Sequence, residues 1–352
     1  MGVVDNLKGM KIGKWDVIDR VHKHKDGTGG SFSVGYFVKE ANSNSDKEYF
    51  MKVINIEGVL ADSDNIMRDL LRLTTNFKFE NDILEKCKRS KLNRIMVPVD
   101  SGETRVPFAM GPYNVVCYIV FEKALGDIRT MRANAQKIDI ISSLTALQNA
   151  AVGIRQIHSQ SIAHQDIKPS NVLQVVDKSH KLTDFGRAWA STLTAEHDGA
   201  GIPGDKSYAP VELWYGYVYG KEEMKRYGID LYLLGQLILF YFFDIPVMGI
   251  YFNKLSDKGI NFNSTDPITY EEILPFLQEA FQEIAEDFEK TVSVHSAELS
   301  IELKGLFIDL CNPNPELRGY CKAMAAKKYS DYLQRLISKF DLILKRYEAS
   351  VN

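Results

Sequence analysis

The sequence is poor in the features that mark several classes of protein. It has four cysteines, Cys87, Cys117, Cys311 and Cys321, and none lies in a CxxC pair, so neither a zinc site nor a redox motif is visible. We expect free thiols in a reducing compartment, which favours a cytoplasmic protein. A basic excess is also missing, because the formal net charge is −3, and this argues against nucleic-acid binding.

Long apolar runs are equally scarce. The one long run, LYLLGQLILFYFF at 231–243, is too short to span a bilayer and is ended by Asp244 and Pro246. We therefore expect a buried core helix and no transmembrane segment. The opening MGVVDNLKGM contains no apolar signal core. It begins with Met-Gly, but Asn6 stands where a myristoylation signal prefers Ser or Thr, so acylation is not expected.

The pattern of apolar residues divides the chain into two parts. The 352 residues are 45% hydrophobic and 25% charged, which is typical of a globular chain with one large domain or two ordinary ones. Strand-like segments dominate the first part: WDVIDRVHKH, SVGYFVKE, EYFMKVINI and VVCYIVFEK. Beyond about residue 126 the spacing becomes helical, apart from NVLQVV and KLTD. This predicts a two-lobed α+β fold with a ligand site in the cleft between the lobes.

A cluster of polar residues in SIAHQDIKPSNVL suggests phosphoryl transfer. That reaction needs a carboxylate to orient the attacking hydroxyl, a cation near the moving phosphate, oxygen ligands for Mg²⁺ and a clamp on the nucleotide phosphates. Asp166 can be the carboxylate and Lys168 the cation. Asn171 and Asp184, the latter in TDFG, carry the hard oxygens that Mg²⁺ prefers.

The ordered combination HQDIKPSNVL followed by TDFG resembles the catalytic loop and metal-binding segment of eukaryotic-type protein kinases. The resemblance implies the bilobal protein kinase fold, with ATP and Mg²⁺ as cofactors and a protein as substrate. It divides the chain into an N-lobe at 12–123, with a five-stranded sheet and helix C, a C-lobe at 124–325, and a helical extension at 326–352.

The resemblance also covers the residues expected around the nucleotide. Lys52 in YFMKVI matches the lysine that binds phosphate, and Glu80 in FENDIL matches its ion-pair partner. The remaining contacts that the resemblance implies are Glu122 and Ala124 in the hinge, Asp127 near the ribose, and Leu173.

Landmarks in the second part favour a protein kinase over a small-molecule kinase. Glu212 in SYAPVELW resembles the glutamate that ends the activation segment, and Arg318 in NPELRG resembles its paired arginine. Asp230 and Gly235 match the start of the buried central helix. Aminoglycoside and choline kinases share the HxD…N loop but generally lack these features and an equivalent of Lys168. That lysine resembles the serine/threonine branch.

The glycine-rich loop departs from the family pattern GxGxxG. In DGTGGSFSVGYFV, one register places Thr28, Gly30 and Ser33 at the three glycine positions, whereas another uses Gly27 and Gly29. Either way, one or two glycines are replaced. The loop is still small and flexible, so we predict that Gly27, Gly29, Gly30 and Ser33 cover the nucleotide phosphates.

Three other departures concern affinity and control. Phe50 stands where the family usually has alanine, and it should crowd the adenine pocket unless the strand shifts or the ring turns aside. Gln165 replaces an arginine that in many kinases binds a phosphate on the activation segment, so we predict activity without activation-segment phosphorylation. Asp205 replaces a threonine, and it can accept a bond from Lys168.

These observations leave two main classes of function open, with a small-molecule kinase as a less favoured third. An active serine/threonine kinase is the first, because every polar group needed for transfer is present. A pseudokinase, which would act as a nucleotide-binding scaffold, is the alternative that Phe50 and the irregular loop support. The C-terminal segment KKYSDYLQRLISKFDLILKRYE is amphipathic and is expected to pack on its own lobe, with a regulatory partner or homodimer contact as the alternative. Its predicted apolar face is formed by Leu333, Leu336, Ile337, Phe340 and Leu344.

Overall fold

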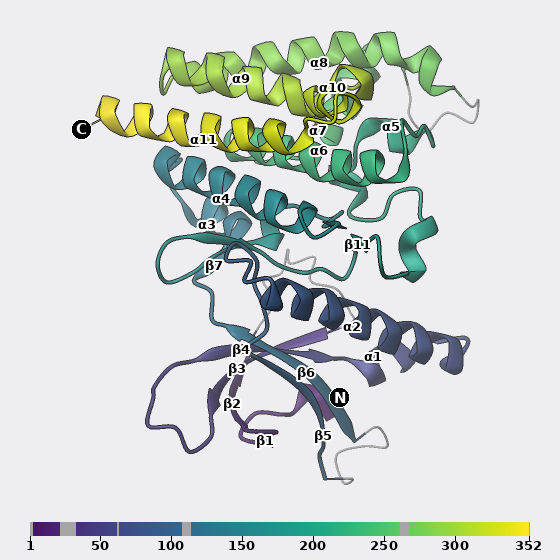
Figure 1. Ribbon diagram of the computed structural model, residues 1–352, viewed down its shortest axis with the longest axis vertical. Coiled ribbons are helices and arrows are strands. Elements are labelled where there is room, and N and C mark those ends of the chain that lie inside the picture. The colour runs from purple at the N-terminus through teal and green to yellow at the C-terminus, as the bar shows by residue number, and fades with distance from the viewer. Residues whose placement is uncertain (1–2, 22–32, 62, 108–113, 261–267, 352) are drawn as a thin grey trace. The chain divides into compact units, whose positions relative to one another are not determined.

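The computed structural model describes residues 3–21, 33–61, 63–107, 114–260 and 268–351. It divides into two compact units, Met1–Leu125 and Gly126–Asn352, and each is described by itself. The first unit is built around a sheet and the second is mostly helical (Figure 1). The predicted α+β class with a β-rich and a helical lobe is therefore confirmed.

An antiparallel sheet of six strands forms the first unit, in the order β1-β2-β3-β4-β6-β5. The prediction of five strands is wrong, because the short strand β1 pairs with β2 across a tight turn in which Gly13 has a φ of 59°. Two residues are too few to show the alternation by which a strand is recognised. The strands are β1 Lys11–Ile12, β2 Trp15–Arg20, β3 Ser33–Glu40, β4 Tyr49–Ile54, β5 Asp100–Arg105 and β6 Val115–Glu122.

Alternation along these strands gives the sheet one strongly apolar face. In β3 and β4, Tyr36, Val38, Met51 and Val53 are fully buried, while the residues between them are partly exposed. The N-terminal residues cover this face, and the Tyr36 hydroxyl donates a hydrogen bond to the Val4 carbonyl. The opposite face of the sheet carries Lys52, a residue of the candidate site.

Two helices complete the first unit, α1 (Ile56–Ala61) and α2 (Ile66–Arg89). The segment between Lys52 and Glu80 forms α1 and the beginning of α2. Asn65 starts α2 by accepting a hydrogen bond from the Arg68 backbone N–H at 3.0 Å.

The second unit is organised around a buried helix, α6. The apolar run 231–243 lies inside this helix and is buried for most of its length, as predicted. Gly235 permits close packing, since a Cβ there would lie 2.3 Å from Cys311 Sγ. The helices are α3 Ile128–Asn134, α4 Ile140–His158, α5 Val211–Trp214, α6 Glu222–Phe243, α7 Val247–Asp257, α8 Tyr270–Ser293, α9 Ala297–Cys311, α10 Gly319–Ala325 and α11 Tyr329–Val351.

Short strands in the second unit frame the segments that carry the candidate chemistry. The loop from His164 to Asn171 connects β8 to β9, and the TDFG segment connects β10 to β11. The strands are β7 Gly126–Asp127, β8 Ile162–Ala163, β9 Val172–Gln174, β10 His180–Leu182 and β11 Trp189–Ala190. They pair as β10-β9-β7 and β11-β8.

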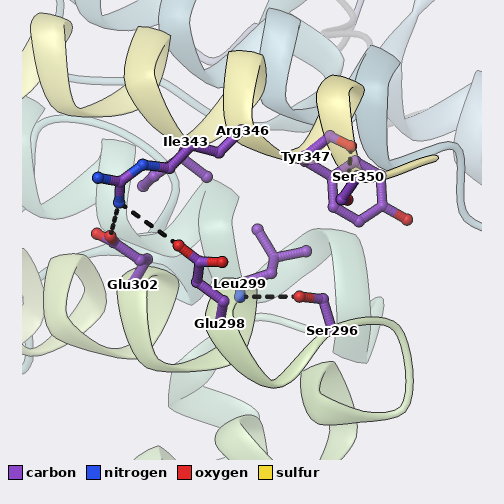
Figure 2. Close-up of a pocket in the computed structure, with 8 residues that line it drawn as sticks. All are labelled: Ser296, Glu298, Leu299, Glu302, Ile343, Arg346, Tyr347 and Ser350. Carbon is purple, nitrogen blue, oxygen red and sulfur yellow. Dashed lines mark hydrogen bonds and ion pairs between the residues drawn. The ribbon is translucent and has the colours of Figure 1, made fainter. Parts of the chain in front are cut away.

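The C-terminal helix α11 packs on α4 within its own unit (Figure 1). Four residues of the predicted face are buried, but Leu344 is only half-buried and Ile343 takes the inward position. Near the end of the helix, the Arg346 guanidinium is 3.0 Å from Glu302 and 3.6 Å from Glu298 of α9, beside a small pocket (Figure 2). The helix is therefore an integral layer of the second unit.

All four cysteines are free, as predicted. No single helix in the described ranges is both long and apolar enough to cross a membrane, although α6 and α7 meet those criteria as a pair bent by 75°.

Candidate active site

The first unit supplies an ion pair. Lys52 lies on β4, on the face of the sheet opposite the buried Met51 and Val53, and Glu80 lies on α2. The lysine Nζ is 2.8 Å from both carboxylate oxygens of Glu80, whose side chain is only 7% exposed. Because a buried carboxylate is costly without a cation beside it, this pair fixes the position of the lysine ammonium. The ion pair expected from the sequence is formed.

Phe50 lies two residues before Lys52 and therefore on the same face of the sheet. Its ring leans over Gly35 of β3: a Cβ added to that glycine would lie 2.6 Å from the ring Cε2. In the cross-strand register, Phe50 faces Phe37 on one side and Phe121 on the other. The ring thus occupies space that a side chain at position 35 would fill. The ring has turned aside, which is one of the two ways in which the crowding expected from Phe50 can be relieved.

The other predicted nucleotide contacts are placed only in part. Gly27, Gly29 and Gly30 lie outside the described residues, whereas Ser33 begins β3 opposite Ile54. In the first unit, Glu122 is the last residue of β6, and Ala124 lies two residues later, outside any helix or strand.

In the second unit, Asp127 and Leu173 face each other across the β7–β9 pair. The Asp127 carboxylate caps α3, since it accepts hydrogen bonds from the Thr130 backbone N–H at 2.8 Å and hydroxyl at 2.9 Å. This capping role is visible in the structure, and the ribose contact stays a prediction.

Buried Asp230 shapes the catalytic loop. Its carboxylate is completely buried in α6 and accepts backbone N–H bonds from His164 and Gln165, both at 2.7 Å. These bonds hold Gln165 at a φ of +68°, a conformation that costs a non-glycine residue free energy unless its surroundings impose it. Asp166 follows directly, so its direction is set by this turn.

The chain Tyr329–His158–Asp230 connects the C-terminal helix to the same carboxylate. The His158 ring nitrogens lie 2.9 Å from Asp230 Oδ2 and 2.7 Å from the hydroxyl of Tyr329, the first residue of α11. The His158 ring also stacks on Tyr227, with centroids 4.1 Å apart. These hydrogen bonds could not be predicted, because Tyr329, His158 and Asp230 lie far apart in the sequence.

Donors surround the Asp166 carboxylate. The Asp205 backbone N–H is 2.8 Å from Oδ1, while the Asn171 amide and the Lys168 ammonium are both 3.2 Å from Oδ2. The pKa of Asp166 lies above its ordinary value, because burial raises it and the negative charge of Asp184 adds to that rise. Lys168, the Asp205 N–H and His164 lower the pKa, but by less. A carboxylate with this setting is fixed in direction and able to accept a hydrogen bond from a substrate hydroxyl.

Lys168 lies between two carboxylates. Its Nζ is 3.2 Å from Asp166 and 3.3 Å from Asp205, so the bond predicted for Asp205 is formed. Burial lowers the pKa of Lys168, but the two neighbouring carboxylates raise it more, and the net pKa lies above its ordinary value. The lysine therefore stays cationic at neutral pH.

Asn171 and Asp184 fit the demands of a magnesium site. The Asn171 side-chain amide donates a hydrogen bond to the Asp166 backbone carbonyl at 2.8 Å. The amide nitrogen is thereby engaged, and the side-chain oxygen of Asn171 is the atom that would bind the metal. The Thr183 N–H donates to the Asn171 carbonyl at 3.0 Å and so brings the neighbouring Asp184 close. No group of three or more His, Cys, Asp or Glu able to hold a metal occurs in the described ranges. Two oxygen ligands are what Mg²⁺ needs when phosphates and water complete its shell.

The end of the activation segment is anchored by a buried pair. Both terminal nitrogens of Arg318 donate to Glu212, at 2.7 and 2.8 Å, and its Nε donates to the Asn312 carbonyl at 2.7 Å. The guanidinium also lies over the Tyr232 ring, 4.7 Å from the centroid. This is the pairing expected from SYAPVELW and NPELRG.

Sequence reasoning missed Arg226. This arginine of α6 is 1% exposed, and it contacts both Gln165 and the Asp198 backbone. The available signal was a cation one helical turn before Asp230, at the beginning of a helix predicted to be buried.

Comparisons with known proteins agree with this geometry. The family model described as "protein kinase domain" matches residues 22–330. The serine/threonine-protein kinase par-4 of Caenorhabditis elegans is 31% identical over 125 residues, which are 33% of this chain and 20% of that protein. SNF1-activating kinase 1 of Saccharomyces cerevisiae is 24% identical over 280 residues, 70% of this chain and 22% of that protein. The matched region thus spans about a fifth of these relatives' length.

Proposed function

Because this chain belongs to the protein kinase family, we propose that it is an active serine/threonine kinase that transfers the γ-phosphate of ATP to a protein hydroxyl. One observation carries the proposal: the Asp166 carboxylate is held by three donors, the Asp205 N–H, Asn171 and Lys168, which supports its role in orienting a substrate hydroxyl. Several relatives are named as serine/threonine-protein kinases, which supports a serine or threonine hydroxyl as the acceptor.

Each residue takes one part of the reaction. Asp166 accepts a hydrogen bond from the substrate hydroxyl and directs its oxygen toward the phosphorus. Lys168 neutralises charge that develops on the transferred group, and Lys52, fixed by Glu80, binds the nucleotide phosphates. Mg²⁺, when bound, neutralises the phosphate oxygens, and Asn171 and Asp184 are the residues that would hold it. Fully active kinases turn over at about 1–100 s⁻¹.

We also propose that activity does not require a phosphorylated activation segment. Gln165 carries no charge with which to bind a phosphate, and the segment is already connected to the catalytic loop through Asp205. Complete phosphatase treatment should leave the rate unchanged, and loss of activity would refute this proposal.

A reducing compartment such as the cytoplasm is proposed for the protein, on the strength of its four free thiols. A protein substrate follows from the family, and a partner or second copy docked on α11 remains an alternative use of that helix.

The pseudokinase alternative depends on Phe50, whose ring occupies the sheet face next to Lys52. A transfer assay separates the two functions, because a nucleotide-binding scaffold would melt at a higher temperature with ATP and yet transfer no phosphate.

The decisive experiment is transfer of labelled phosphate from ATP with Mg²⁺ to a generic protein substrate. Asp166→Asn and Asp184→Ala should both abolish transfer, and acid hydrolysis of the product should yield phosphoserine or phosphothreonine. Asp257→Asn is a matched control, because this aspartate is exposed at the end of α7. Transfer that persists in both site variants would contradict the assignment.

A further inference from the structure

We propose that Arg226 is a positioning residue that holds the activation segment against the catalytic loop, in the place where other kinases use a phosphate. The inference rests on the proposed kinase activity and extends it to the control of the same site. It also gives Gln165 a role as a hydrogen-bond acceptor for Arg226, whereas the sequence showed only that an arginine is missing there.

The Arg226 guanidinium connects three parts of the second unit. Its Nε donates to Glu222 within α6 at 2.6 Å, and its Nη2 donates to the Asp198 backbone carbonyl at 2.6 Å. Its Nη1 donates to the Gln165 side-chain oxygen at 3.3 Å. Since Arg226 is 1% exposed, these contacts operate away from water, where hydrogen bonds from a charged donor are strong.

Gln165 has the chemistry that this arginine requires. Its amide oxygen accepts from the guanidinium, and its amide nitrogen donates to the Arg226 backbone carbonyl at 2.8 Å. An arginine at position 165 has no acceptor and would place a second guanidinium beside the first in a buried site. In this protein the cation is Arg226 of α6 instead of an arginine in the catalytic loop, and Gln165 supplies the acceptor that Arg226 needs.

The contact at Asp198 extends to the catalytic aspartate through the activation segment. Asp198 lies in the short 3₁₀ helix Glu196–Gly199, and its carboxylate accepts a hydrogen bond from the Ala195 N–H at 2.8 Å, which closes the turn. A few residues later, the Asp205 N–H donates to Asp166. Because the acceptor for Arg226 is a backbone carbonyl that is always present, the segment is held without any modification.

Hydrogen exchange and steady-state kinetics test the proposal together. In Arg226→Gln, we expect amides of residues 195–205 to exchange about tenfold faster or more, and kcat to fall about 10- to 100-fold, the range expected when a charge-assisted hydrogen bond is lost. The KM for ATP should change by less than about twofold, because nucleotide contacts are untouched. Lys225→Gln, next to it on α6, is the matched control and should resemble the wild type.

An exchange of the two side chains provides the sharper test. Gln165→Arg alone should lose activity, and the double variant Gln165→Arg with Arg226→Gln should regain at least part of it. If Arg226→Gln fails to fold, Gln165→Met removes the same link at nearly constant length and should shift exchange and kcat in the same direction.

Wild-type exchange at 195–205 together with wild-type kcat in Arg226→Gln, or in Gln165→Met, would overturn the proposal. So would a double variant no better than Gln165→Arg. The exchange measurement needs neither nucleotide nor turnover, so it stays informative if the wild type transfers no phosphate, an outcome that would refute the proposed function alone.

Discussion

Gly204 is the position at which a single methyl group should separate the activation segment from the catalytic loop. A Cβ there would lie 2.3 Å from the Gln165 carbonyl oxygen and 2.8 Å from Asp166 Oδ1. The first atom belongs to the backbone of a loop held by Asp230, so the segment carrying Gly204 must move instead. The neighbouring Asp205 N–H, now 2.8 Å from Asp166, would move with it.

The magnitude follows from that hydrogen bond. A bond to a charged acceptor contributes about 1.5–3 kcal/mol, so its loss from an oriented catalytic carboxylate predicts a fall in kcat of about 10- to 150-fold in Gly204→Ala. The Asp205 N–H is also one of the groups that lower the pKa of Asp166. Its loss should therefore raise that pKa further and move the acidic limb of the kcat profile to higher pH.

The assay is steady-state phosphate transfer over a range of pH, with Gly201→Ala as the matched control. Gly201 lies in the same segment, and an added Cβ there would meet no atom within 4 Å. The variants carry the same methyl group, so a general loss of backbone freedom in the segment should affect both. Equal kcat values and equal acidic limbs in the two variants would refute the reasoning.

Other perturbations have equally definite outcomes. Lys168→Gln removes a charge that lowers the pKa of Asp166, so a larger fraction of Asp166 is protonated and inactive at low pH. The acidic limb of the kcat profile should therefore move to higher pH, and an unmoved limb would contradict the contact. Arg318→Leu leaves Glu212 buried without its partner, which should cost about 3–5 kcal/mol and lower the Tm by about 6–20 °C in calorimetry. Adding Glu212→Leu should recover part of the lost stability. If nothing is recovered, the unpaired carboxylate of Glu212 is not the cause of the loss. Phe50→Ala should leave the affinity for ATP within about 1 kcal/mol of the wild type, because the ring leans over Gly35, and titration calorimetry showing binding tightened by more than that would contradict this placement.

The parts of the site that could be predicted are those with several functional groups in one short segment. Asp166, Lys168 and Asn171 lie within one loop, and their spacing along the chain already limits their geometry. The ion pairs of Lys52 and Arg318 join distant segments, and they could be predicted only because the order of the motifs matched a known family. Composition and periodicity alone would have left both cations as surface charges.

The features that escaped prediction depend on contacts between segments. The space over Gly35 that accommodates Phe50 follows from the cross-strand register, which the sequence does not state. The position of Arg226 in a helix predicted to be buried was a signal, but its acceptors could not be predicted because they come from the catalytic loop and the activation segment. Strand β1 is too short for its alternation to be seen, and its existence depends on the turn at Gly13.

The contact between Tyr329 and His158 changes where the catalytic unit should be considered to end. The family match stops at residue 330, just after the first residue of α11, so a chain trimmed there would keep Tyr329 but lose Leu333, Leu336 and Phe340 that seat the helix. Tyr329 would then no longer be held against His158, and the apolar surface of α4 would be open to water. The smallest fragment suited to kinetics or crystallisation therefore includes the whole of α11.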